Sequence, residues 1–268
     1  MAWGQPVADR SRKDVVSSFT IIKGALVSES YAAFRQWDFT ADRRTNIARL
    51  KDQNVFGARS ANWLRDLGWV LNRRFEPNVR DRPLVRMAQC GVDLAVWRPA
   101  LLWHMTRDEF LVRDFLINWL EPSFSEGVFR VRVDDVYPYL AAIAERGLTQ
   151  DGKPWSEQTL KRVASGLLGI AAELGLLKGS AVREFGHHHL PDEGFLYVLH
   201  AIADTERNGD EVIRSPEWQM YLYNPATVEQ ELLRLHQFRK LHYERAGSIV
   251  ALSLPCESAA AYAEKLCA

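Results

Sequence analysis

The chain has 268 residues, of which 47% are hydrophobic and 25% charged, and this composition excludes a largely disordered protein. The longest uncharged stretches fall well short of the roughly 18 apolar residues that a bilayer-spanning helix needs. The first residues lack the apolar core of a secretory signal, so we expect a cytoplasmic protein with no membrane partner.

The charge is zero overall but unevenly distributed. Residues 1–90 contain 16 Lys and Arg against 9 Asp and Glu, a net charge of +7, and residues 91–268 carry the opposite −7. Such asymmetry is typical of a basic module that meets a polyanion, although charges can also cluster by chance. Residues 191–268 are net −5, so we do not expect that end to lie on DNA.

Hydrophobic periodicity predicts a mainly α, multi-helical fold with helix-turn-helix and winged helix-turn-helix units and a few short strands. In chain order, the expected helices cover residues 18–37, 42–53, 59–75, 84–91, 93–104 and 108–120. The segment at 121–127 contains Pro, Ser and Gly, which makes it the best candidate for a boundary between domains. After it we expect a strand at 129–133, helices at 134–146 and 156–174, a hairpin formed by 176–178 and 181–185, helices at 192–207 and 225–245, a strand at 248–254 and a final helix.

These elements group into five segments along the chain. They are a flexible basic arm (1–16), an N-terminal helix-turn-helix-like domain (17–90), connecting helices (91–127), a winged-helix-like domain (128–206) and an acidic helical C-terminal region (207–268). In the last segment, Leu232, Leu235 and Phe238 are predicted to form the apolar side of an amphipathic helix. That side either packs on the body of the protein or binds a partner.

The first candidate site is the helix pair at 42–53 and 59–75. A short connection at 54–58, which contains Gly57, suits the tight turn of a helix-turn-helix. The second helix has one apolar face, and its opposite face carries side chains that can bond base edges, since Arg suits guanine and Asn suits adenine. The candidate DNA-binding residues are Arg59, Asn62, Arg65 and Arg73, with Arg43 and Arg44 on the preceding helix as phosphate contacts. An ordinary helical hairpin with a solvated basic face is the alternative.

The second candidate site lies at 129–191, where strand, helix, helix and hairpin follow one another as in a winged helix. Ser156 is a good N-cap for the long helix, whose apolar stripe leaves a polar opposite face. That face and the hairpin supply Gln158, Lys161, Arg162, Ser165, Arg183 and His187 as candidate DNA-binding residues. The connection at 146–155 is long for this motif, so an all-helical core with a surface hairpin remains open.

No catalytic or cofactor motif accompanies these sites. The chain lacks the Gly-rich loops, zinc-binding helices and nucleophile elbows of common enzyme families. The adjacent residues His187, His188 and His189 cannot easily hold one ion, because neighbours on an extended segment point to opposite sides. We therefore expect a non-enzyme with no catalytic residue, no metal and no cofactor, and an unrecognised nuclease is the weaker alternative.

The cysteines point to a reducing compartment. Cys90, Cys256 and Cys267 show neither pairing nor metal-site spacing. An odd and sparse set is typical of proteins whose thiols stay free, so the sequence predicts no disulfide framework.

Two phrases of this sequence resemble the BrxA family of BREX bacteriophage-exclusion systems. One is Ser18-Phe19-Thr20 before a Gly-Ala-Leu segment, and the other is Trp155-Ser-Glu-Gln-Thr-Leu-Lys-Arg-Val-Ala-Ser-Gly-Leu-Leu followed by Leu174-Gly-Leu-Leu-Lys. The likeness covers about residues 17–206. It implies a helical, non-enzymatic component that binds double-stranded DNA. It also implies companions that include an adenine methyltransferase, an AAA+ ATPase and a phosphatase-like protein.

Two other functions remain open beside a DNA-binding accessory protein. One is a protein-interaction scaffold in the same defence complex, in which the acidic C-terminal part docks a partner. The other is RNA binding, because the resembled family has been likened to an RNA-binding antitermination factor.

Overall fold

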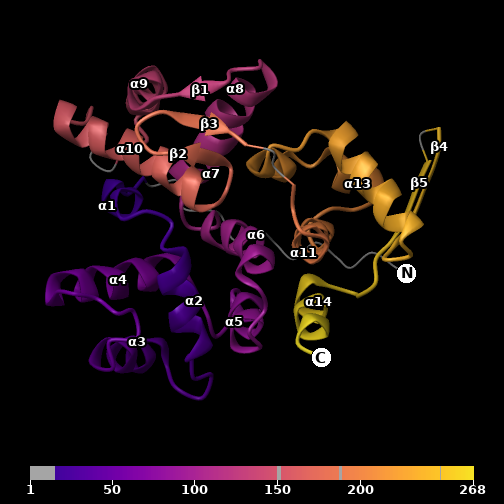
Figure 1. Cartoon of the computed structure of the whole chain (residues 1–268), viewed down its shortest axis with the longest axis horizontal. Helices are drawn as coiled ribbons and strands as arrows, with labels where there is room; N and C mark the ends of the chain where they lie inside the picture. Colours follow the sequence, from indigo (N-terminus) through magenta and orange to yellow (C-terminus); the bar gives the residue numbers. More distant parts are fainter. Residues whose placement is uncertain (1–15, 150–151, 187–188, 248) are drawn as a thin grey trace.

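The computed structural model describes residues 16–149, 152–186, 189–247 and 249–268. The fold is mainly α and multi-helical with a few short strands, as predicted (Figure 1). The N-terminal third contains α1 (Ser18–Ile22), α2 (Val27–Arg35), α3 (Arg43–Asp52), α4 (Ala61–Arg74) and α5 (Arg82–Gln89). The next elements are α6 (Leu94–Met105), α7 (Phe110–Phe115), the single π-helical turn η1 (Leu116–Leu120) and α8 (Glu121–Ser125).

A small sheet and the longest helix form the middle of the chain. Here lie β1 (Arg130–Val131), the 3₁₀ turn η2 (Val133–Val136), α9 (Tyr137–Glu145), α10 (Glu157–Glu173), β2 (Leu177–Gly179) and β3 (Arg183–Phe185). The strand order is β1-β3-β2, and both pairings are antiparallel. Strand β1 precedes α9 and α10 in the sequence, yet it pairs with β3 and so extends the β2–β3 hairpin to a three-stranded sheet.

The C-terminal part is helical with one further hairpin. It contains α11 (Asp192–Ala203), α12 (Gly209–Arg214), the 3₁₀ helix η3 (Pro216–Tyr221), α13 (Pro225–Gln237), β4 (His242–Ala246), β5 (Ile249–Ser253) and α14 (Ala259–Leu266). Strands β4 and β5 pair antiparallel. None of the helices in the described ranges has the length and apolar character that crossing a membrane requires.

Two predicted helices are wrong in extent. The helix expected at 18–37 is two helices, because Gly24 and Leu26 between them have positive φ angles of 85° and 57°. The helix expected at 225–245 ends at Gln237, and the chain turns at Arg239 (φ 56°) into β4. A right-handed helix cannot pass through residues with positive φ, so both interruptions are backbone effects.

Other differences concern single segments. The segment at 121–127, predicted as a break, is helical as far as Ser125, and α7, η1 and α8 follow one another directly. Phe238, predicted to be on the apolar side of the C-terminal helix, is 65% exposed, whereas Leu232 and Leu235 are buried. One hydrophobic core cluster extends from Val16 to Ala263, so the segments of the chain share a common interior.

The cysteine prediction is also wrong. Cys90 and Cys267 form a disulfide across a sequence separation of 177 residues, and Cys256 is free. Spacing along the chain could not reveal this pair, because the fold alone brings the ends of α5 and α14 together.

Candidate nucleic-acid interface

Helix α10 has one buried face and one exposed polar face. The Ser156 side chain caps the helix by accepting a hydrogen bond from the Thr159 amide at 3.3 Å. One side of the helix enters the core with buried residues such as Val163 and Leu167. The opposite side is exposed and carries the four predicted contacts Gln158, Lys161, Arg162 and Ser165.

The basic residues of this face have free charges. Neither Lys161 nor Arg162 has an ion-pair partner among the described residues. Near the end of the same face, a Cβ added at Gly169 would meet no atom within 4 Å, so no neighbouring element covers the helix there. The face is therefore open to a large ligand along several turns.

Helix α10 is held firmly on its inner side by α1. Gly166 lies so close to α1 that an added Cβ would come within 2.6 Å of the Ile21 carbonyl oxygen. The Glu173 carboxylate accepts a hydrogen bond from the Leu26 amide at 3.1 Å. Burial raises the pKa of Glu173, although these backbone hydrogen bonds oppose the rise. These contacts fix the polar face to a rigid support.

Arg183 lies in the sheet beside this face. It is on β3, opposite Val131 of β1 and Gly179 of β2, and only 8% of the residue is exposed. Its Nε and Nη1 atoms have no hydrogen-bond partner among the described residues. Burial lowers the pKa of Arg183, but its usual value is so high that the guanidinium stays charged at neutral pH. An uncompensated positive charge thus lies next to the turn of the β2–β3 hairpin.

Arg130 and His189, which lie beside the hairpin in the sheet and after it in the chain, have local partners. Arg130 on β1 forms an ion pair with Glu184 on β3 at 2.8 Å. His189 lies 3.6 Å from a Glu231 carboxylate oxygen on α13. His187, which we predicted as a wing contact, lies outside the described residues.

Helices α3 and α4 form the second predicted site. Asp42 and Ser60 cap them, accepting hydrogen bonds from the amides of Thr45 at 2.7 Å and Trp63 at 3.2 Å. The connection spans residues 53–60 and is longer than the five residues predicted. The Asn54 side chain shapes it by bonding both the amide and the carbonyl of Ala58.

The side chains predicted for the exposed face of the second helix lie at the surface, although α4 begins at Ala61 and Arg59 therefore precedes it. Arg59, Asn62 and Arg65 are exposed, while Leu67 and Leu71 are buried. Arg65 has only a 3.4 Å contact, to Asp66. Of the remaining predicted contacts, Arg44 is exposed and Arg73 is partly buried, while the exposed Arg43 donates a hydrogen bond to the Phe75 carbonyl at 3.1 Å.

Helix α1 joins the two candidate sites. Its neighbour Lys23 forms an ion pair with Asp66 of α4 at 2.7 Å, and this hydrogen bond lowers the pKa of Asp66. The rings of Phe19 on α1 and Trp69 on α4 pack edge to face with their centroids 4.8 Å apart. Since α1 also packs on α10, the helices α4, α1 and α10 lie on one side of the molecule, away from α13, α14 and the β4–β5 hairpin (Figure 1).

Sequence reasoning missed the buried charge that supports this arrangement. Arg74 is fully buried, and it donates hydrogen bonds to Glu109 at 2.9 Å and to the carbonyls of Thr20, Gly24 and Ala25. It thereby fixes the loop between α1 and α2. The sequence contained a sign of this burial, because Arg74 follows Leu67 and Leu71 at helical spacing and so lies on the same buried face.

Comparison with known proteins gives one match. The family model described as BrxA matches residues 18–200. Searches of curated proteins and of solved structures give no match.

Proposed function

Because the chain belongs to the BrxA family and is thereby a component of a BREX phage-defence system, we propose that it binds double-stranded DNA as a non-enzymatic accessory protein. Its place would be the cytoplasm, where such DNA is found. Other BREX proteins, including the methyltransferase, the AAA+ ATPase and the phosphatase-like protein, are the companions with which it would act.

The observation that carries this proposal is the open polar face of α10. An α-helix fits the major groove of B-form DNA, where Arg, Lys and Gln side chains reach base edges. Lys161 and Arg162 are exposed there without ion-pair partners among the described residues. A face of this kind meets the physical requirements of groove binding.

The chain order around α10 supports the same proposal. The helices α7 to α8, strand β1, helices α9 and α10 and the β2–β3 hairpin follow the order of a winged helix, and β1 pairs with β3. In that interpretation α10 is the recognition helix and the hairpin is the wing. Arg183 would then place its uncompensated charge near the phosphate backbone, which fixes register without reading sequence.

Fluorescence anisotropy with a short labelled duplex tests the proposal. The wild type is compared with Lys161→Glu/Arg162→Glu and with Arg59→Glu/Arg65→Glu at two salt concentrations. We expect salt-sensitive binding, with log affinity falling against log salt by about 0.9 per phosphate neutralised. We expect the α10 variant to lose more affinity than the α4 variant, since Arg65 has an acidic neighbour.

Two results would contradict DNA binding. One is an affinity that does not change with salt, and the other is no binding at low salt by protein whose circular dichroism is that of a folded helical chain. A matched single-stranded RNA and an RNA duplex in the same assay separate DNA from RNA as the preferred ligand.

A protein-interaction scaffold is the second candidate function. The observation in its favour is the net −5 charge of residues 191–268, whose elements α11, α13 and α14 lie away from α4 and α10 (Figure 1). Co-purification with a companion BREX protein that survives Lys161→Glu/Arg162→Glu would favour this function. Loss of co-purification in that variant would tie the partner to the α10 face instead.

A further inference from the structure

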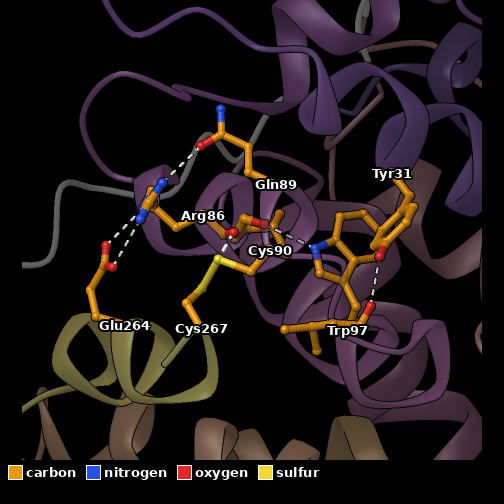
Figure 2. Close-up of a disulfide and its surroundings, with 9 residues drawn as sticks. Tyr31, Arg86, Gln89, Cys90, Trp97, Glu264 and Cys267 are labelled. Atoms are coloured by element: carbon orange, nitrogen blue, oxygen red, sulfur yellow. Dashed lines mark hydrogen bonds and ion pairs between the residues drawn. A yellow bond between two sulfur atoms is a disulfide. The ribbon is translucent and has the colours of Figure 1, made fainter.

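The C-terminal helix α14 is joined covalently to α5. Cys90 follows the last residue of α5, Cys267 follows the last residue of α14, and their Cα atoms lie 5.3 Å apart (Figure 2). Cys90 is exposed and Cys267 is partly exposed. A thiol reductant in solution can therefore reach this bond.

Helix α14 packs on α5 and α11 with Ala259, Tyr262 and Ala263 buried in the core, but its polar contacts are few. Arg86 of α5 binds Glu264 through two contacts of 3.0 and 3.2 Å, but both side chains are substantially exposed, and exposed ion pairs stabilise little (Figure 2). At the other end of the helix, the Ala259 amide donates a hydrogen bond to Asp204 at 3.0 Å. Between these two contacts, the ring of Tyr262 stacks on the ring of His200 with centroids 4.6 Å apart.

Helix α14 is too short to persist without its neighbours. It has eight residues, whereas isolated helices below roughly 12–15 residues are marginal in water. Its persistence thus depends on its packing against α5 and α11, on the polar contacts just described and on the disulfide.

Helix α14 also forms one wall of a cavity of about 790 Å³. Ala259, Ala260, Ala261 and Glu264 line the cavity from α14. The other walls come from α5, α6 and α11 and include Arg82, Arg86, Trp103 and Tyr197. Movement of α14 would uncover this mixed basic and aromatic surface.

We propose that the Cys90–Cys267 disulfide is a redox-controlled clasp that keeps α14 over the cavity, and that its reduction frees α14 and opens the cavity wall. A dithiol reductant supplies two electrons and two protons. Its first thiolate breaks the S–S bond and forms a mixed disulfide, and its second thiol displaces the protein sulfur. The products are the thiols of Cys90 and Cys267 and the cyclic disulfide of the reductant.

Hydrogen–deuterium exchange of the full chain tests the clasp. The oxidised protein is compared with protein reduced by dithiothreitol without denaturant. We expect amides in residues 259–268 to exchange at least about tenfold faster after reduction, while α3 and α10 exchange at unchanged rates. Cys90→Ser should show the fast exchange without reductant and no response to it.

Cys256→Ser is the matched control, because Cys256 is the cysteine outside the disulfide. It should behave as the wild type in both states. Three outcomes would overturn the clasp: equal exchange of residues 259–268 in both states, a parallel loss of protection throughout the chain, or free thiols at both Cys90 and Cys267 in aerobically purified protein.

Discussion

At the scale of single residues, buried charges organise this fold more than its surface charges do. Arg74 and Glu109 are 0% and 2% exposed, and together they fix the backbone between α1 and α2. Removing one member of such a pair leaves an unpaired charge in the interior, which is costly. The net charge of the N-terminal segment therefore overstates the charge available to a ligand.

The Arg74 pair gives a stability prediction. Replacing Arg74 with Met should lower the free energy of unfolding by about 3–5 kcal/mol, because Glu109 and three carbonyls lose their donor. The control Arg59→Met, at an exposed position, should change it by less than about 0.5 kcal/mol. Urea unfolding monitored by circular dichroism measures both, and similar losses in the two variants would refute the assignment.

The pH dependence of stability should depend on Asp81. This carboxylate is fully buried, and although burial opposes ionisation, the hydrogen bonds and charges of His104 and Arg80 lower its pKa to about 2 from 3.8. A lowered pKa in the folded state stabilises the protein above about pH 4, and this contribution is lost as the pH falls towards 2.

Asp81→Asn isolates this contribution. The variant should be less stable than the wild type at pH 5, and the difference should shrink by about 2 kcal/mol between pH 5 and pH 2. Urea titrations at several pH values measure it. A difference that stays constant over this range would show that Asp81 does not titrate between the two states.

At the scale of elements, the structure confirms what periodicity predicts and departs from it where tertiary contacts decide. Helix α10, its Ser156 cap and the β2–β3 hairpin follow from apolar spacing and turn residues. The positive φ angles of Leu26 and Arg239 do not, because neither residue type signals a left-handed conformation. The exposed face of α10 could be read from the sequence, but its support by α1 required the fold.

Two glycines on α10 test that support. Gly166→Ala should destabilise the protein by about 1–3 kcal/mol, because the new methyl group would lie 2.6 Å from the Ile21 carbonyl oxygen. Gly169→Ala, on the same helix, meets open space and should stabilise it by up to about 1 kcal/mol. Thermal unfolding of both variants provides the comparison, and equal shifts would contradict the close approach of α1 and α10.

At the scale of the whole molecule, the fold determines where the charged segments lie and which cysteines pair, because both depend on contacts between residues that are far apart in the sequence. The segregation of a basic segment at 1–90 and an acidic segment at 191–268 was visible in the sequence, and the fold places α4 of the basic segment away from α13 and α14 of the acidic one. The Cys90–Cys267 disulfide was not predictable, since it joins residues 177 apart.

This segregation gives a prediction for binding. Lys161→Gln should weaken DNA affinity and reduce the salt slope by about 1, because it removes one positive charge from the face that we propose meets the DNA polyanion. Glu257→Gln changes the charge by the same amount with the opposite sign at an exposed C-terminal position. It should leave affinity within about twofold, because salt screens interactions between surface charges beyond roughly 8–10 Å. Anisotropy titrations at matched salt measure both variants, and a gain of affinity in Glu257→Gln as large as the loss in Lys161→Gln would indicate a diffuse attraction in place of a defined face.

The rigid connection through α1 has a consequence for how the proposed DNA contacts would combine. Lys23 and Phe19 contact α4, and Gly166 of α10 packs on Ile21, so movement of one polar face relative to the other would break contacts of the same short helix. Binding of one face would hold the other at a high effective concentration above the same duplex. Affinity should then rise in one step once a duplex is long enough to reach both faces, and further lengthening should add little.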